Sequence, residues 1–290
     1  MIAVGVVLPS LAVVREQALD LAAAAQYVED AGLDSVWHGD HLAPGGPVRD
    51  CAVALAVAAA STRRITVGTS VYVPAIRPLA WAAKQVATLV ELSGGRFVLG
   101  VGSGGGPEQW AAAGVPYGER GARTDTALEL LPALLAGEHV TLPDGATVTL
   151  APAVAPPPVW VGNASAVALR RAARFDAGWF PSLITADEVA RGAARLAADG
   201  HRPTVAIGIA GALGAGVPSR PEIAAGIAAA YGRPVEEVAS VPLSGGPTEA
   251  AEHLATYAAA GAAHAVVGIA GGDWRRQVDL LAEARALLVA

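Results

Sequence analysis

The stretch FVLGVGSGGG, residues 97–106, joins an apolar, strand-like run to a turn that contains five glycines. Gly100, Gly102 and Gly105 match the spacing G-x-G-x-x-G of a dinucleotide-binding loop, which would indicate a Rossmann dehydrogenase that uses NAD. In that motif a helix begins at the third glycine, whereas here Pro107 and a stretch that we expect to be irregular follow. We therefore favour a strand-to-helix corner of another α/β fold, where the backbone must approach a neighbouring group closely. A merely flexible loop is the alternative.

The segments on either side alternate between strand-like and helix-like patterns, which indicates a parallel sheet with helical crossovers. Eight such units in 290 residues predict a (β/α)8 TIM barrel in one domain, residues 1–290. A six-stranded doubly wound sheet is the alternative. The predicted strands are residues 2–9, 34–40, 65–73, 96–102, 159–162, 177–182, 203–211 and 264–271, and the predicted helices are 15–32, 50–62, 78–95, 121–136, 165–175, 186–200, much of 221–260, and 273–288.

One segment interrupts the alternation between the fourth and fifth strands. Residues 139–150 contain two short alternating runs around Pro-Asp-Gly, which is a hairpin signal. A proline-rich linker, residues 151–160, follows it. We interpret 137–157 as an insertion in the barrel and not as a domain boundary.

Composition narrows the classes of function. The net charge is −6 with no basic stripe, so we do not expect a nucleic-acid partner. The longest apolar stretch is too short to span a bilayer and no basic amphipathic helix is evident, so we expect no membrane contact. The single cysteine, Cys51, is expected to be a buried thiol, and this cysteine usage fits a reducing cytoplasm.

Candidate functional residues gather where predicted strands end, which in a barrel is the catalytic face. The second strand ends in His38, Asp40 and His41. One histidine could act as an acid or base near neutral pH, or Asp40 could only cap a helix beside solvated histidines. We expect no metal, because no second cluster of His, Cys, Asp and Glu occurs at ligand spacing.

Two further strand ends carry small or hydroxyl side chains. The third ends in Thr69, Ser70 and Val71, which could hydrogen-bond a ligand or could be ordinary strand formers. The fifth ends in Gly-Asn-Ala-Ser, residues 162–165, directly before a helix. That segment predicts either a phosphate site at the helix N-terminus or a simple cap by Asn163 or Ser165. Trp179 and Phe180 on the sixth strand could wall a pocket, although such aromatics are more often core residues.

Three stretches together resemble the bacterial luciferase-like family of flavin- and deazaflavin-dependent oxidoreductases. They are EDAGLDSVWHGDHL (29–42), the segment from TRRITVGTS to FVLGVGSGGG (62–106), and PPPVWVGNASAVALRRAARFDAGWFPS (156–182). A late stretch, residues 245–268, also fits the family pattern, so the resemblance covers most of the chain. It implies a luciferase-like barrel with a tricyclic ring bound at the C-terminal rim.

The resemblance also implies roles for individual residues. His41 would donate or accept a proton, Asp40 would contact the ring, and a non-prolyl cis peptide between Ser70 and Val71 would support the ring. The cofactor-binding residues that it implies are Asp40, Thr69, Ser70, Val71, Gly102, Ser103, Gly104, Gly105, Gly162, Asn163, Ala164 and Ser165.

One departure concerns a glutamate that sugar-phosphate dehydrogenases of the family carry soon after the fourth-strand glycines. Gly105 stands at that position here, and Glu108 lies nearby but shifted. A sugar-phosphate substrate is therefore doubtful, and we treat the question of whether Glu108 replaces the missing group as open.

The resemblance favours an oxidoreductase that uses coenzyme F420 to transfer hydride to or from a small organic, natural-product or modified-peptide substrate. Two alternatives remain. One is an FMN-dependent monooxygenase supplied with reduced flavin by a separate reductase, and the other is a non-catalytic cofactor-binding relative. A homodimer is expected, since family members are often dimers.

Overall fold

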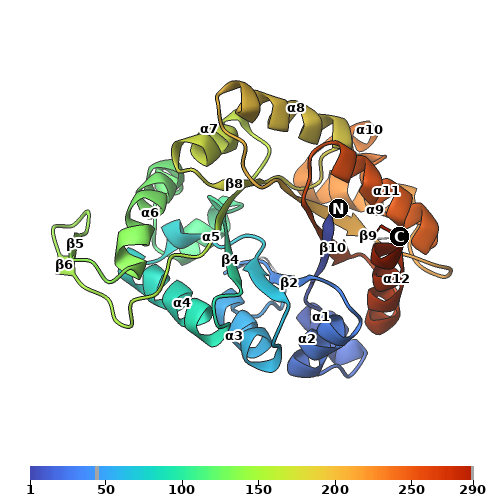
Figure 1. Cartoon of the computed structure of the whole chain (residues 1–290), viewed down its shortest axis with the longest axis horizontal. Helices are drawn as coiled ribbons and strands as arrows, with labels where there is room; N and C mark the ends of the chain where they lie inside the picture. Colours follow the sequence, from blue (N-terminus) through green and yellow to red (C-terminus); the bar gives the residue numbers. More distant parts are fainter. Residues whose placement is uncertain (43–45, 289–290) are drawn as a thin grey trace.

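The computed structural model describes residues 1–42 and 46–288, and these form a ring of parallel strands surrounded by helices (Figure 1). The strand order is β8-β7-β4-β3-β2-β1-β10-β9, with every neighbouring pair parallel. The strands are β1 (Ala3–Val7), β2 (Ser35–His38), β3 (Thr66–Thr69), β4 (Phe97–Val101), β7 (Val159–Gly162), β8 (Gly178–Phe180), β9 (Ala206–Gly211) and β10 (His264–Ile269).

The two ends of this strand order, β8 and β9, also approach each other. The backbone N–H of Trp179 donates to the carbonyl of Thr204 over 2.9 Å, and the N–H of Leu183 donates to the carbonyl of Gly208 over 2.8 Å. Single parallel bridges between the two segments nearly complete the ring. The predicted (β/α)8 barrel is therefore confirmed, and the doubly wound alternative is wrong.

Helices connect the strands on the outside of the ring (Figure 1). They are α1 (Leu11–Glu16), α2 (Leu21–Asp30), α3 (Cys51–Ser61), α4 (Leu79–Leu92), α5 (Pro107–Ala112), α6 (Arg120–Leu135), α7 (Ala166–Arg174), α8 (Ala186–Ala198), α9 (Arg220–Tyr231), α10 (Val235–Val238), α11 (Pro247–Ala259) and α12 (Trp274–Leu287), with 3-10 turns at Pro74–Ile76 and Tyr117–Glu119.

Two sequence expectations about these connections are wrong. Residues 15–32 form no single helix, because α1 ends at Glu16 and Asp20 caps a separate helix, accepting a hydrogen bond from the N–H of Ala23. The stretch after Pro107 is not irregular either. It begins the short helix α5, in which proline occupies the first turn, where its missing N–H costs nothing.

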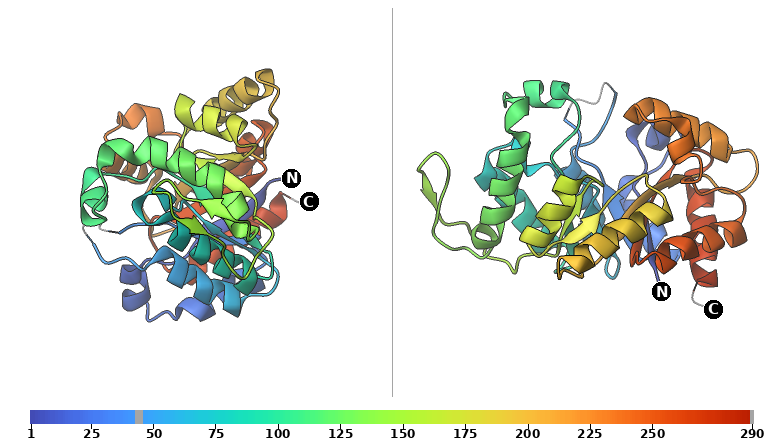
Figure 2. Two further views of the ribbon diagram at one scale, coloured as in Figure 1. Left: turned by 90° about the vertical axis from the view of Figure 1, so that its left-hand side faces the viewer. Right: turned by 90° about the horizontal axis from the view of Figure 1, so that it is seen from above.

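The segment between α6 and β7 contains the predicted hairpin. Strands β5 (Val140–Thr141) and β6 (Thr147–Val148) pair antiparallel, and Figure 2 shows the hairpin projecting from the side of the barrel. The hairpin adds no strand to the ring. None of the helices within the described ranges is both long enough and apolar enough to cross a membrane.

Large side chains fill the barrel interior where glycines on other strands leave room. Trp37 and Trp160 stack with ring centroids 5.3 Å apart. A Cβ atom on Gly68 would lie 2.2 Å from the ring of Trp37, and one on Gly178 would lie 2.3 Å from the ring of Trp160. These glycines are therefore required by the packing of the two indoles, because close-packed interiors accommodate almost no added volume.

A hydrogen-bonded chain lies among these aromatic rings. The indole N–H of Trp37 donates to the hydroxyl of Ser35 over 2.7 Å, and that hydroxyl oxygen lies 2.6 Å from Nε2 of His264. An indole nitrogen can only donate, so the Ser35 hydroxyl is free to donate to Nε2 of a neutral imidazole. Burial lowers the pKa of His264 to about 4, against a smaller opposing effect of Asp34.

The buried imidazole predicts an acid-sensitive fold. Its pKa is about 4 in the folded chain and about 6.5 when unfolded, so the unfolded state binds more protons between these values. The stabilisation is complete above pH 6.5 and falls by about 3 kcal/mol as the pH drops to 4. Urea unfolding measured across this window should show the decline.

The matched variant is His264→Gln, which keeps a neutral polar group in the same place. It should reduce the slope of unfolding free energy against pH in this window, leaving the contributions of His38 and His253, whose pKa values burial also lowers. An unchanged slope in His264→Gln would contradict the assignment.

Candidate active site

A cavity of about 450 Å³ opens at the carboxyl ends of the barrel strands. Side chains of the barrel strands line it, including Val7 at the end of β1, Phe180 at the end of β8 and Val266 on β10. Ten residues of the predicted site are also in its wall: Asp40, His41, Ser70, Val71, Gly102, Ser103, Gly104, Gly105, Gly162 and Asn163.

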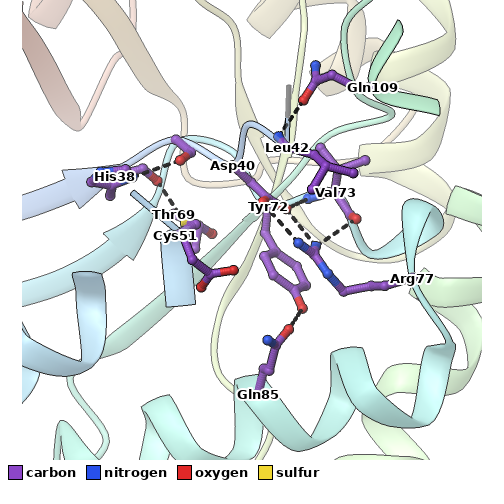
Figure 3. Close-up of polar contacts among 12 residues, drawn as sticks. His38, Asp40, Leu42, Cys51, Thr69, Tyr72, Val73, Arg77, Gln85 and Gln109 are labelled. Atoms are coloured by element: carbon purple, nitrogen blue, oxygen red, sulfur yellow. Dashed lines mark hydrogen bonds and ion pairs between the residues drawn. The ribbon is translucent and has the colours of Figure 1, made fainter. Parts of the chain in front are cut away.

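A buried ion pair joins Asp40, which lines this cavity, to Arg77 (Figure 3). Both carboxylate oxygens of Asp40 accept hydrogen bonds from the guanidinium of Arg77, at 2.6 and 3.0 Å. The backbone N–H of Val73 donates to the same carboxylate over 2.9 Å. Asp40 is only 6% exposed, so its charge is balanced mainly by groups of the protein. The carboxylate that the resemblance assigns to ring contact is thus already held by three internal donors.

Arg77 is itself held in position from several sides. It donates to the carbonyl of Val73 over 3.0 Å, and its guanidinium lies 4.5 Å from the ring centroid of Tyr72. The Tyr72 hydroxyl donates to Gln85 on α4 over 2.6 Å. Burial alone would lower the pKa of Arg77, but the hydrogen bond and charge of Asp40 outweigh it and raise the pKa. Arg77 therefore stays a cation beside the Asp40 carboxylate.

The glycines of the opening stretch pack against the end of β3. A Cβ on Gly100 would lie 2.1 Å from the carbonyl oxygen of Thr69, and one on Gly102 would lie 2.3 Å from the side chain of Val71. From the other side, a Cβ on Gly162 would lie 2.8 Å from Val71. The peptide bond between Ser70 and Val71 is cis, as the resemblance implied. The glycines thus leave space for the end of β3 and for Val71, which follows it. This packing explains why a dinucleotide-like spacing occurs in this fold.

The two histidines after β2 have different surroundings. His38 is buried, with Nδ1 2.7 Å from the carbonyl of Gly39, and burial lowers its pKa. His41 is exposed and lines the cavity, and a Cβ on Gly39 would lie 3.0 Å from its Nε2. His41 is therefore the histidine that can meet a bound molecule. Cys51 is buried as expected, and its thiol donates to the carbonyl of His38 over 3.3 Å.

Three predicted site residues are not in the cavity wall that the described chain forms. The hydroxyl of Thr69 is buried and donates to the carbonyl of Gly100 over 2.8 Å. Ser165 caps α7, accepting from the N–H of Ala168 over 3.3 Å, and the side-chain oxygen of Asn163 accepts from the N–H of Ser165. Ala164 lies between them and is exposed. This segment thus has the simple capping geometry, at the edge of the cavity.

Other cavity residues were not found from the sequence. Gln109 of α5 lines the cavity and accepts from the N–H of Leu42 over 2.9 Å, whereas Glu108 is exposed and is not among the described lining residues. Arg77 is not among the lining residues but pairs with Asp40, and the sequence could have indicated this, because a lone cation within an apolar stretch needs an acidic partner. Of the two aromatic residues that the sequence offered as possible pocket walls, Phe180 lines the cavity, while Trp179 packs outward against Gly192 of α8.

The part of the cavity wall formed by the glycine turn carries few side chains. Residues 102–106 include four glycines, so the wall they form is nearly free of side chains, and Val71 and Phe180 add apolar surface. In residues 1–42 and 46–288, no three His, Cys, Asp or Glu side chains lie where they could share a metal ion.

Comparison with known proteins identifies the family. The luciferase-like monooxygenase model matches residues 5–217, and the chain therefore belongs to that family. An F420-dependent glucose-6-phosphate dehydrogenase from Beutenbergia cavernae is 41% identical over 175 residues, which cover 55% of this chain and 51% of that protein. The chain spans about half the length of the curated relatives it matches.

Solved structures show the same fold over the whole chain. An F420-dependent secondary alcohol dehydrogenase in complex with an F420-acetone adduct superposes with a TM-score of 0.79 at 16% identity, covering 99% of both chains. A monooxygenase from Streptomyces bottropensis superposes with a TM-score of 0.76 at 20% identity, covering 100% of both chains. Such neighbours therefore include both F420-dependent enzymes and monooxygenases.

The buried pair predicts a large effect of removing its cation. Arg77→Ala leaves the Asp40 carboxylate buried without its counterion and should lower the free energy of unfolding by about 3 kcal/mol or more. Chemical denaturation of the variant measures this loss.

The matched control is Arg174→Ala, which breaks the pair with Glu129, in which both side chains are about 60% exposed. Such surface pairs contribute about 1 kcal/mol or less. Equal losses in the two variants would show that the Asp40–Arg77 pair does not stabilise the fold.

Proposed function

We propose that this protein is an oxidoreductase that binds coenzyme F420 in the cavity at the carboxyl ends of the strands. The observation that carries the proposal is the wall at residues 102–105 and 162, where glycine backbone and Val71 form a surface with few side chains, open to a planar ring. Relatives named as F420-dependent dehydrogenases support the choice of cofactor.

The residues around this wall have different proposed roles. When bound, F420 supplies hydride chemistry at C5 of its deazaflavin ring. Val71, Gly102 and Phe180 would hold and shield the ring, since a protein's main contribution in such enzymes is orientation and exclusion of water. Asp40 and Arg77 would keep the rim in place, because their hydrogen bonds join the segment after β2 to the segment after β3.

His41 is our proposed acid–base residue. It is exposed at the cavity, so it can reach the substrate atom that gains or loses a proton as hydride moves. Imidazole can serve in either direction, as a donor when the substrate is reduced and as an acceptor when an alcohol is oxidised.

We further propose that the phosphate-bearing tail of the cofactor runs toward the exposed segment 163–165 at the start of α7. The N-terminus of that helix carries free backbone N–H groups and favours an anion. Ser165 and Asn163 already shape this turn through their own hydrogen bonds.

A binding titration tests the choice of cofactor. We expect oxidised and reduced F420 to bind at least tenfold more tightly than FMN, because the proposal assigns the cavity to a deazaflavin. Changes in cofactor absorbance and fluorescence report the affinities. His41→Ala should leave F420 affinity unchanged and lower turnover by about 100-fold or more, the usual contribution of an acid–base group.

The control variant is His139→Ala, because His139 lies on the projecting β5–β6 hairpin and hydrogen-bonds Thr149. It should change neither affinity nor turnover. Tight FMN binding with oxygen consumption would instead support the monooxygenase alternative. Full activity in His41→Ala would show that this histidine takes no part in the chemistry. F420 binding without turnover, in the parent protein and in every variant, would support a non-catalytic relative.

We also propose a homodimer formed through α3 and α4. Val53 and Val57 on α3 and Trp81 on α4 are apolar and exposed, and Val53 and Trp81 are about two-thirds exposed, at 65% and 67%. The two helices are neighbours on the barrel surface. An apolar surface of this kind is typical of a protein interface.

Sedimentation velocity tests the dimer. The parent protein should sediment as a dimer, and the double variant Val53→Lys, Trp81→Lys should sediment as a monomer, because two buried ammonium groups would oppose association. Val235→Lys, at an exposed valine on α10, is the control and should remain dimeric. A parent protein that is monomeric at high concentration would refute the proposal.

A further inference from the structure

A second hollow adjoins the cavity. It lies over the end of β9, the loop at 216–218 and one face of α9, and it has a volume of about 820 Å³. Ala210, Ile227 and Tyr231 line both hollows. The two hollows are therefore neighbours that share three wall residues, and we call the second hollow the α9 groove.

The surface of the α9 groove is mostly apolar. Val217, Pro218, Ile223 and Ile227 are among its lining residues, and Tyr231, which is 65% exposed, lines both the groove and the cavity. An apolar chain that lies here would remove this surface and its own surface from water, which is favourable in proportion to the area covered.

The groove offers an anion no partner. Neither lysine nor arginine occurs among the described residues that line the cavity or the groove. The charged groove residue is Glu222, which caps its own helix by accepting from the N–H and hydroxyl of Ser219, at 2.8 and 2.6 Å. These hydrogen bonds lower the pKa of Glu222, so it is a carboxylate at neutral pH and would repel a phosphate or carboxylate.

One glycine inside α9 is not required by the packing of neighbouring atoms. Gly226 lies in the middle of the helix, and a Cβ built on it would meet no other atom within 4 Å. Glycine is a poor helix residue compared with alanine. Because Gly226 lines the groove, its missing side chain keeps the groove open along α9.

We propose that the α9 groove binds the apolar chain of an extended, uncharged substrate whose reacting end lies in the cavity beside His41. This inference rests on the proposed function, because it assigns the cavity itself to the cofactor ring and the reacting end. It separates this chain from a sugar-phosphate dehydrogenase, whose anionic substrate would need a cation that these walls lack. Ile227 and Tyr231 are then specificity-determining residues, since they line both the groove and the cavity.

The test is a ligand series with the F420-loaded protein. Calorimetry with straight-chain 2-alkanones from hexanone to decanone should give affinities that rise about threefold to fourfold for each methylene, the value expected for burial of a CH2 group. An ω-carboxylate analogue of the same length should bind at least tenfold more weakly.

Gly226→Leu places a side chain in the groove and should abolish the gain with chain length. Gly226→Ala is its matched control, because it adds one methyl group and should retain most of the gain. Both variants should fold, since the added Cβ meets no neighbour and helix propensity improves. Thermal melting confirms this before ligands are compared.

F420 affinity, measured separately by fluorescence, distinguishes the two levels of the proposal. Unchanged F420 binding with no dependence on alkanone length would overturn the groove and leave the proposed function standing. Weaker F420 binding in Gly226→Leu would also overturn the proposed substrate groove, because it would indicate that the cofactor tail occupies the groove. If the parent protein does not bind F420, the proposed function is refuted, whatever the alkanone affinities are.

Discussion

The buried ion pair of Asp40 and Arg77 is the constraint on which the site depends. It joins a residue that follows β2 to a residue that follows β3, and the Asp40 carboxylate also accepts a hydrogen bond from the backbone N–H of Val73. A single buried charge would be costly, and the pair is tolerated because the carboxylate faces a guanidinium of matching geometry and three donors satisfy it. The segments that carry His41 and Val71 are thereby fixed relative to each other at the mouth of the barrel.

Inside the barrel, glycines lie opposite large side chains and leave the space that those side chains fill. Gly68 and Gly178 accommodate the indoles that close the barrel interior, while Gly102 and Gly162 accommodate Val71 one layer higher. The interior below is therefore filled, and the space above remains a cavity. A ligand in this fold binds at the rim because that is where the packing leaves volume.

The cavity has two unlike sides. Toward β2 and β3 it carries an imidazole and a hydrogen-bonded carboxylate, and toward β9 and α9 it is apolar and adjoins the α9 groove. Polar groups on the first side can move or hold a proton, while the second side can only bind by excluding water. This asymmetry makes the proposed division between a reacting end and an apolar chain a direct consequence of the wall chemistry, and the family's loops can vary the second side without disturbing the first.

The sequence by itself determined the barrel, because strand and helix periodicities are local and eight repeats of them admit few topologies. It also determined most of the rim, since residues such as His41, Ser70 and Gly162 follow strands directly and parallel strands end at one face. Only the tertiary structure decided what these residues contact. Asp40 and Arg77 are 37 positions apart in the sequence, so no local pattern shows their pairing. The inward and outward directions of Thr69, Trp179 and Phe180 depend on register, and the groove at Gly226 exists only where α9 crosses the end of β9. Each of these is a contact between distant segments, and its energy depends on burial and geometry that no local pattern encodes.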